Sequence, residues 1–572
     1  MATFFDDASL VMIPSGIKES KLYSIKPTDG SGDFTFSRGT DTATRVNASG
    51  LIEKERGNQL LQSNQFSNAS WLKEIGASVT SGQSGYDGTN NAWLLNTDGT
   101  QYARLRQTLS SSGVKTFSLY AKAGTLDWIG LYNGGGTGSA FFDLSNGVTG
   151  NIGSGAINAS IISIGGGWYR CEYAFSESIT DIRIYLTGAN GTFTTTAGNI
   201  YIQDAQLNQG LVAQPYIETT TAAVYEGITD NLPRLDYSGG ASCPSLLLEP
   251  SRTNIIPSSE DIDSVWSKLR VSVENNNTTS PEGLVNAGKS TATAVSGTHA
   301  SYDTFSGSVT AGNDYFISCF VKKATTKYIR LNEGYTSAYV TFNFDDQTTD
   351  LQNGASNLLL EEHENGWYRL GFKFTADSSG NSQFALYIND DNNNTSYVGS
   401  GEAVYLWGAQ IEAGSYPTSY IPTMGTSASR AKDTINQNIQ TITSGLTEGT
   451  LFIEFEKPNT GENNDLMRLR GSGTLGRAYI YNNGLGFAAD WGTSQNFTIG
   501  ENTKGAWRLD SLSSGVEFLN GVKGSGASGT AWSDIRILRF NADGNGGVLK
   551  IKQILFFPTA LTDAECITLT TL

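Results

Sequence analysis

The sequence is poor in the residues that build metal and redox sites. Its 572 residues include only four cysteines and two histidines, and no two cysteines form a CxxC pair. Such scattered cysteines predict neither a disulfide framework nor a zinc site. With so few histidines, a histidine-based metal centre or catalytic triad is poorly supplied. We therefore expect that the protein uses no cofactor.

Positive charge and long apolar runs are also scarce. Lys and Arg total 38 against 55 Asp and Glu, which gives a net charge of −17 at pH 7. This balance, without any basic run, excludes a surface that follows the phosphates of a nucleic acid. No stretch approaches the roughly 18 apolar residues of a membrane span. The first residues lack the basic start and apolar core of a secretion signal, so we expect no signal peptide.

Glycine and small polar residues are abundant instead. The chain has 66 Gly and 12 Pro, and charged residues make up only 16% of it, which argues against long surface helices. A mixture rich in Thr, Ser, Asn, Tyr and Phe suits short strands joined by polar turns. Because the chain is too long for one hydrophobic core, we predict an all-β protein of several domains.

A duplicated segment organises the chain. The tetrapeptide Gly-Trp-Tyr-Arg occurs at residues 167–170 and again at 366–369. Residues 117–122 align with 317–322 at an offset of 200. Further short matches follow in the same order, which indicates an internal duplication. Alternating strands separated by Gly/Asn/Ser turns predict that each copy is a β-sandwich of the jelly-roll kind.

The duplication divides the chain into five parts. We predict an N-terminal attachment or docking segment (1–45), a first jelly-roll repeat (46–220), a packed connector (221–250), a second repeat (251–430) and a further β-sandwich (431–572). The N-terminal segment contains two short strand-like pieces and is too small to fold alone. The connector is apolar enough to pack against a domain.

Strand alternation separates the core face of each repeat from the opposite face. In the Gly-Trp-Tyr-Arg strand, Tyr169 and Cys171 share one apolar face, and Trp168 and Arg170 share the other. The predicted non-core face carries Trp128, Tyr132, Trp168, Arg170, Arg183 and Tyr185 in the first repeat, and Tyr328, Arg330, Trp367, Arg369 and Tyr387 in the second. Sugar rings stack on aromatic side chains, and Arg donates to hydroxyls, so these are candidate glycan-binding residues. The alternative is that the aromatics form cross-strand pairs or are covered by the N-terminal stretch.

Catalytic and metal sites have little support. Glu454 and Glu456 share a strand face, superficially like a glycosidase pair, but two solvent-facing strand carboxylates explain them better. The run Asn389-Asp-Asp-Asn-Asn-Asn394 could offer oxygen ligands to calcium, yet it lacks the spacing of a calcium loop and reads as a polar turn. We predict that the protein is not an enzyme.

Two resemblances extend these predictions. The ending, a strand followed by Ala-Leu-Thr-Asp-Ala-Glu at 560–565, resembles the close of concanavalin-A-like (laminin-G-like) domains, in which Thr562 caps a helix and Glu565 completes a capping box. The repeats resemble jelly-roll carbohydrate-binding modules. Residues 8–16, 34–40, 43–53, 243–254 and 407–422 together look like tailed-phage fibre or head-spike proteins.

The phage resemblance implies a virion surface protein, made in the host cytoplasm, that docks on capsid or tail proteins through its N-terminal segment. It also implies a homo-oligomer, a trimer. The predicted activity is weak adhesion to host surface glycans, strengthened by repetition. The alternatives are a purely structural capsid or tail decoration and a polysaccharide-degrading tail spike.

Overall fold

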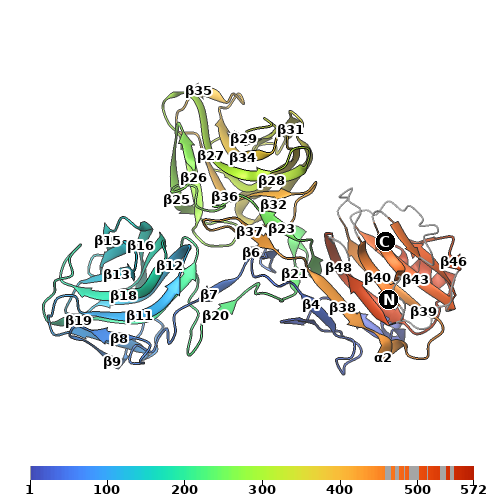
Figure 1. The fold of residues 1–572 in the computed structure, drawn as a ribbon, viewed down its shortest axis with the longest axis horizontal. Coiled ribbons are helices and arrows are strands. Elements are labelled where there is room, and N and C mark those ends of the chain that lie inside the picture. The colour runs from blue at the N-terminus through green and yellow to red at the C-terminus, as the bar shows by residue number, and fades with distance from the viewer. Residues whose placement is uncertain are drawn as a thin grey trace.

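The computed structural model describes residues 2–457, 465–470, 476–481, 484–487, 502–511, 513–528, 536–541 and 547–572. Strands dominate these residues, and the few helices are short. The strands form three separate lobes, which are coloured blue to teal, green to yellow, and orange to red in Figure 1. Each lobe is a pair of packed sheets. The prediction of an all-β chain of tandem β-sandwiches is therefore confirmed.

The first sandwich consists of two six-stranded antiparallel sheets. One sheet has the order β16 (Ala156–Gly165), β17 (Trp168–Ser176), β12 (Val114–Ala123), β19 (Gly198–Gln209), β10 (Ala92–Thr97) and β9 (Ala77–Gln83). The other has the order β15 (Val148–Ile152), β14 (Ser139–Asp143), β13 (Trp128–Gly134), β18 (Ile179–Thr187), β11 (Arg104–Ser111) and β8 (Leu72–Glu74).

The second sandwich repeats this topology strand for strand. One sheet has the order β32 (Ser356–His363), β33 (Trp367–Thr375), β28 (Asp314–Lys323), β36 (Ala403–Ala413), β26 (Ala287–Ala292) and β25 (Val271–Thr278). The other has the order β31 (Thr349–Gln352), β30 (Tyr339–Asn343), β29 (Tyr328–Glu333), β34 (Gly380–Asn389), β27 (Ser296–Val309) and β24 (Ser267–Leu269), with β35 (Ser396–Val398) added on β27. The duplication seen in the sequence is thus a duplication of backbone topology.

The Gly-Trp-Tyr-Arg strands, β17 and β33, occupy matching positions and point the same residues inward. Cys171, Tyr173 and Phe175 are buried in the core of the first sandwich, and Tyr169 packs at its margin. The corresponding side chains of β33 do the same in the second core. Alternation along the strand therefore predicts the inward face correctly.

The third sandwich is assembled from distant parts of the chain. One sheet has the order β21 (Arg234–Asp236), β22 (Ser245–Leu248), β48 (Leu549–Phe557), β39 (Gly449–Glu456), β43 (Thr503–Ser511), β44 (Ser514–Leu519) and β45 (Val522–Lys523), with β1 (Leu10–Met12) on β48 and β46 (Ala527–Ser528) on β44. The other has the order β2 (Ile17–Lys18), β3 (Lys21–Leu22), β4 (Phe34–Ser37), β38 (Thr434–Asn438), β47 (Ile537–Phe540), β40 (Asp465–Arg470), β41 (Gly476–Tyr481) and β42 (Gly484–Phe487).

The N-terminal segment, predicted to serve for attachment or docking, is built into the third sandwich. Leu10, Phe34 and Phe36 are fully or almost fully buried in the core of the third sandwich. Leu246 and Leu248 of the connector are buried in the same core. Because these short strands cannot bury an apolar face alone, they complete sheets whose other strands come from the C-terminal part of the chain.

Short ladders and helices complete the described chain. Two-strand ladders join β5 (Arg45–Val46) to β6 (Ile52–Glu53), β7 (Arg56–Asn58) to β20 (Val224–Glu226) and β23 (Arg252–Asn254) to β37 (Ala428–Arg430). The helices are α1 (Ala2–Asp7), α2 (Gln440–Thr443) and α3 (Asp563–Thr570). At α3 the Thr562 hydroxyl accepts from the Glu565 backbone, and the Glu565 carboxylate accepts from the Thr562 backbone. The predicted capping box is confirmed.

A buried ion cluster lies between the second and third sandwiches. Arg234 contacts both Asp433 and Glu249, the latter at 2.7 Å. Arg430 lies 2.9 Å from Glu249, and Arg38 lies 3.3 Å from Asp433. The five side chains come from the N-terminal segment, the connector and the chain that follows the second repeat. Since removing one partner would leave an uncompensated buried charge, the cluster fixes how these segments meet.

Candidate functional site

The outward side of the β15–β14–β13–β18–β11–β8 sheet gathers four of the predicted site residues. Trp128 and Tyr132 on β13 and Arg183 and Tyr185 on β18 all point away from the core, as alternation predicts. The register pairs Tyr132 with Arg183 directly. The Arg183 guanidinium lies over the Tyr132 ring, 5.3 Å from its centroid. We call this surface, together with the side chains described next, the first face.

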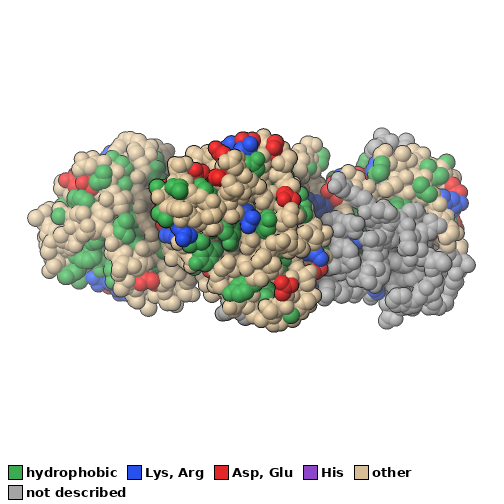
Figure 2. All heavy atoms as spheres, turned by 90° about the horizontal axis from the view of Figure 1, so that it is seen from above, with side chains coloured by type: hydrophobic (Ala, Val, Ile, Leu, Met, Phe, Trp, Pro, Cys, Tyr) green, Lys and Arg blue, Asp and Glu red, His purple; other side chains and the backbone are tan. Residues whose placement is uncertain are grey.

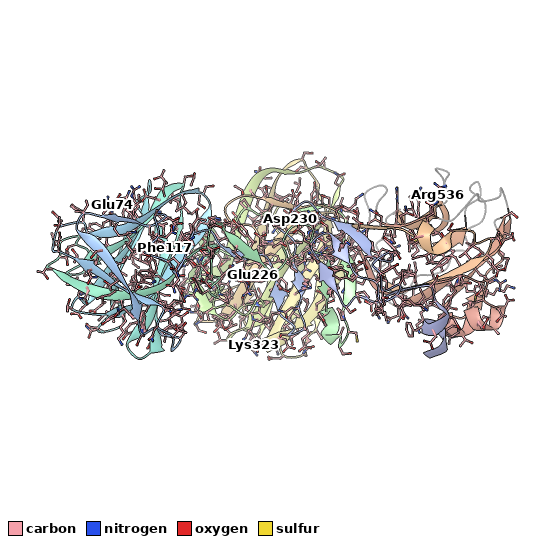
Figure 3. The ribbon with its side chains drawn as sticks, turned by 90° about the horizontal axis from the view of Figure 1, so that it is seen from below. Glu74, Phe117, Glu226, Asp230, Lys323 and Arg536 are labelled. Carbon is pink, nitrogen blue, oxygen red and sulfur yellow. The ribbon has the colours of Figure 1, made fainter. Side chains whose placement is uncertain are left out.

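Two further arginines extend the first face along β11. Arg104 Nε donates to Glu74 Oε2 at 2.7 Å, and Arg106 Nη2 donates to Glu74 Oε1 at 2.7 Å. On the neighbouring strand Arg183 Nε donates to Asp181 Oδ1 at 2.6 Å. Three guanidinium groups and two carboxylates thus alternate over adjacent strands, with Glu74 at the margin of its lobe in Figure 3. Asp143, which lies opposite Trp128 on the same side of the sheet, brings the face to three positive and three negative charges.

These ion pairs shift the ionisation of the face. Hydrogen bonds from Arg106 hold the pKa of Glu74 below its usual value, and burial opposes them in part. The hydrogen bond to Asp181 raises the pKa of Arg183. The side chains of Glu74, Arg183 and Arg106 keep partial exposure, with values of 23–26%, whereas Asp181 is buried.

An aromatic ridge borders the charged part of the first face. Phe193, from the chain between β18 and β19, lies 4.6 Å from Tyr185 and 5.3 Å from Phe141 between ring centroids. Tyr102 stacks on its other side at 5.7 Å. Phe193 covers Tyr185, which is only 4% exposed, so Tyr185 supports the ridge and is not itself an open contact. Tyr102, by contrast, is exposed.

Trp128 is held against the edge of the sheet. A Cβ added at Gly150 on β15 would lie 2.6 Å from Trp128 Cζ3, so the indole packs directly on the backbone of that strand. The side chain remains half-buried. A glycine at this position allows the close approach of the indole to the strand.

The equivalent side of the second sandwich is aromatic and nearly uncharged. The registers place Ala385 where the first face has Arg183, and Ala300 and Tyr302 where it has Arg104 and Arg106. Arg330 lies 3.8 Å from the centroid of the Tyr339 ring. Tyr328 and Tyr387 are half-buried neighbours on β29 and β34. The predicted residues of this repeat thus lie together, on a surface with different chemistry.

The other four predicted residues do not form an open face. Trp168 is 4% exposed, Trp367 0% and Arg369 7%, and Arg170 is half-buried. The Trp367 indole donates to the Thr279 carbonyl at 3.0 Å and packs with Trp407, Phe320 and Tyr420. In the first repeat Tyr86 and Tyr216 cover Trp168. Alternation correctly predicted that these side chains point away from the sandwich core. It could not predict that other chain segments cover them.

Several residues of the first face escaped the sequence argument. Glu74, Arg104, Arg106, Asp181 and Phe193 belong to it, yet none was singled out. Arg104-Leu-Arg106 does alternate as a strand with two outward arginines. Its position beside Arg183 depends on pairing between β11 and β18, which are nearly eighty residues apart in sequence and whose register only the structure gives.

The candidate enzymatic and metal positions are satisfied by neighbouring side chains. Glu454 accepts from Gln553 at 2.8 Å, and Glu456 pairs with Lys552 at 2.7 Å. The Asp390 carboxylate accepts from the backbones of Asn392 and Asn394, which closes a polar turn. Among the described residues there is no group of three or more His, Cys, Asp or Glu placed to hold a metal ion.

Charge elsewhere on the surface is dispersed. On the side seen in Figure 2, acidic and basic side chains are scattered over a mostly uncharged surface. None of the helices that the structure describes is long and apolar enough to cross a membrane. The first face therefore differs from the visible surface in gathering charged groups beside aromatic rings.

Comparison with known proteins gives fold neighbours only. No family model matches the chain, and no curated protein matches it. Among solved structures, the chain is similar to the CBM40 of a Ruminococcus gnavus IT-sialidase bound to α2,3-sialyllactose, with 20% identity, a TM-score of 0.18 and coverage of 22% of this chain and 84% of that one. A CBM22-1–CBM22-2 tandem from Paenibacillus barcinonensis Xyn10C is 12% identical with a TM-score of 0.18, over 62% of this chain and 98% of that one. Trypanosoma rangeli sialidase is 10% identical with a TM-score of 0.21, over 93% and 98%. These neighbours are mainly carbohydrate-binding modules, and at these scores the likeness supports no argument about function.

Proposed function

We propose that the protein is a non-catalytic glycan-binding protein and that the first face is its binding surface. One observation carries the proposal. Arg104, Arg106 and Arg183 present guanidinium groups on one side of the sheet, which also carries the half-buried rings of Trp128 and Tyr132. Planar N–H donors beside aromatic faces match a sugar, whose hydroxyls accept hydrogen bonds and whose C–H faces stack on rings.

The arginines of the first face favour an acidic glycan. Three guanidinium groups gather there, on a chain with net charge −17. Guanidinium groups bind carboxylates in a bidentate manner, and Arg is better suited to this than Lys. Part of each guanidinium is already used by Glu74 or Asp181, so a single site binds weakly. Several copies of the protein on one particle would raise the overall avidity.

We further propose that the chain is a tailed-phage virion surface protein, a head fibre or spike or a tail fibre, that contacts host surface glycans. This rests on the resemblance of residues 8–16, 34–40, 43–53, 243–254 and 407–422 to such proteins. Assembly as a trimer belongs to the same proposal. Because residues 10–37 are built into the third sandwich, docking on capsid or tail proteins would use this sandwich as a folded unit. The concanavalin-A-like relationship of this sandwich likewise rests on its resemblance.

A glycan array probed with the full chain tests the binding proposal. We expect uronic-acid-containing polysaccharides to bind and neutral ones to bind less. Arg183→Lys keeps the charge but loses the bidentate geometry, and we expect an affinity reduced about tenfold, or roughly 1.4 kcal/mol. Arg330→Ala, at the equivalent side of the second sandwich, is the matched control and should leave this binding unchanged.

Two outcomes would contradict the proposal and favour another function. Absence of binding to every glycan, with the protein folded, would favour a purely structural decoration of the virion. Release of oligosaccharides from a host capsule incubated with the protein would overturn the non-catalytic assignment and favour a degrading tail spike. The position of the subunit in a virion map tests the phage assignment separately.

A further inference from the structure

A polar cavity of about 100 Å³ lies where the first sandwich, the N-terminal strand segment and the chain after the second repeat meet. Its lining comes from three regions of the chain. These are residues 41–59, residues 209–225 and residues 422–424. Glu226 and Asp230 in Figure 3 mark the segment that runs past it, between the lobes. The volume holds several waters or one small polar group, because one water needs about 10–15 Å³ on this measure.

Three acceptor side chains line the cavity. The carboxylates of the exposed Asp41 and the half-buried Glu55 form no hydrogen bond or ion pair with any residue that the structure describes. Gln214 is only 5% exposed, and its Oε1 is buried without a hydrogen-bond donor. Buried acceptors in native proteins are normally satisfied, so the Gln214 Oε1 points to a missing donor, which the two neighbouring carboxylates would also bind.

The two cations of the lining are occupied elsewhere. Arg56 pairs with Glu226 at 2.9 Å. Lys54 lies between two buried carboxylates, 2.9 Å from Glu260 and 2.7 Å from Glu282. Neither of them therefore pairs with Asp41 or Glu55.

Two further charged groups act on Glu55 from outside the lining. Lys115 attracts Asp41 and Glu55 at longer range, but burial lowers its pKa. Asp230 adds a further negative charge beside Glu55. Burial, Asp41 and Asp230 together raise the pKa of Glu55 to about 7.

We propose that this cavity binds a primary ammonium group, held by Asp41, Glu55 and Gln214. An ammonium group has three N–H donors and no acceptor, which matches a lining that offers two carboxylates and the Gln214 Oε1. Tyr225 lines the cavity with an exposed ring, available for a cation–π contact. The group would come from the free amine of an amino sugar or from an aliphatic polyamine. This site is separate from the first face and does not depend on the function proposed for it.

Calorimetric titration of the full chain distinguishes the chemistry and its source. The probes are glucosamine, glucose, N-acetylglucosamine and putrescine. We expect an amine to bind while glucose and N-acetylglucosamine do not. Binding of glucosamine identifies an amino sugar as the source, and binding of putrescine alone identifies a polyamine. Equal binding of glucose, or no binding by either amine, would overturn the proposal.

Variants locate the site. Glu55→Gln and, at the exposed Asp41, Asp41→Asn should each lower amine affinity about tenfold, because each removes a charged acceptor. Glu19→Gln removes one negative charge from an exposed position of the third sandwich and is the charge-matched control. If Glu19→Gln weakens binding as much as Glu55→Gln does, the amine binds the acidic surface in general and the proposal is wrong.

The pH dependence gives an independent readout. Alkyl amines stay protonated through this range, like Lys with its pKa of about 10.4. Ionisation of Glu55, with its pKa of about 7, should strengthen putrescine binding about tenfold between pH 6 and pH 8. The increase should vanish in Glu55→Gln. An unchanged pH profile in that variant would contradict the role of Glu55.

Discussion

Two tryptophans show how much of a single residue's environment can be predicted from the sequence. Trp128 and Trp367 both leave the core of their sandwich by strand alternation. The Trp128 side chain is half-buried, whereas the Trp367 side chain is buried against Trp407, Phe320 and Tyr420 from other segments. Alternation gives the side of the sheet because it is local geometry. Coverage depends on chain segments that are distant in sequence, so it could not be predicted.

Replacing Trp367 should therefore cost stability and not ligand binding. Trp367→Ala leaves a large cavity and an unpaired Thr279 carbonyl, so we expect the second sandwich to lose about 3–5 kcal/mol in its free energy of unfolding. Urea denaturation followed by tryptophan fluorescence measures this. Tyr328→Ala, at a half-buried position of the same sandwich, is the control and should cost much less. Equal losses would show that Trp367 is not a packing residue.

Asp204 provides a prediction about pH. It is buried, accepts a hydrogen bond from the Tyr86 hydroxyl at 2.8 Å, and burial raises its pKa to about 6. A carboxyl whose folded pKa exceeds its unfolded pKa favours folding when it is protonated. Its contribution is thus greatest below about pH 4 and is lost as the pH rises through 6, by on the order of 2 kcal/mol.

The Asp204→Asn variant isolates this contribution. Asn can still accept from Tyr86 but does not ionise, so we expect the variant to be more stable than the parent at pH 8 and similar to it at pH 4. Urea midpoints at the two pH values give the comparison. A constant difference between the two proteins across this range would refute the assignment.

At the scale of elements, the two repeats were predictable and the third sandwich was only partly so. Matched segments such as 117–122 and 317–322 lie on β12 and β28, which hold the same place in their sheets. The strand-like pieces near the N-terminus are strands, β1 and β4. The sequence did not predict which sheet these strands join, because Val11 pairs with Leu555, more than five hundred residues away. No local pattern in either segment specifies such a pairing.

Strand β4 gives a direct test of this arrangement. Phe36 is 1% exposed in the third core, whereas its neighbour Thr35 is exposed on the other side of the strand. Phe36→Ala should destabilise the third sandwich by about 3–5 kcal/mol, and Thr35→Ala should have little effect. Limited proteolysis of the C-terminal part reports the difference. If the N-terminal segment does not pack in the third sandwich, the two variants should be cleaved equally fast.

At the scale of the whole molecule, the buried ion cluster links the second sandwich to the third. Glu249 is fully buried, and the charges of Arg430 and Arg234 hold its pKa well below its usual value. Its stabilising effect is present above the unfolded pKa of about 4.3 and is lost as the pH falls below it. The junction should therefore be more acid-sensitive than the sandwich cores.

Glu249→Gln is the corresponding variant. It leaves buried positive charge uncompensated, and we expect a cost of about 3–5 kcal/mol, expressed as separation of the lobes before the sandwiches unfold. Small-angle scattering at neutral pH would show an expanded particle with retained β-structure in circular dichroism. Glu274→Gln, on β25 and away from the cluster, is the control. An unchanged scattering curve would show that the cluster does not hold the lobes together.

The interleaved third sandwich also constrains how the protein is made. Each repeat closes its sheets from consecutive strands, so it can fold as soon as its own residues have left the ribosome. Strands β1 and β4 cannot, since their partners β48 and β38 are synthesised hundreds of residues later. Throughout that interval Leu10, Met12, Phe34 and Phe36 remain uncovered on the nascent chain. The last domain to close is thus the one whose first strands emerge earliest, and these strands are the segments in greatest need of a chaperone.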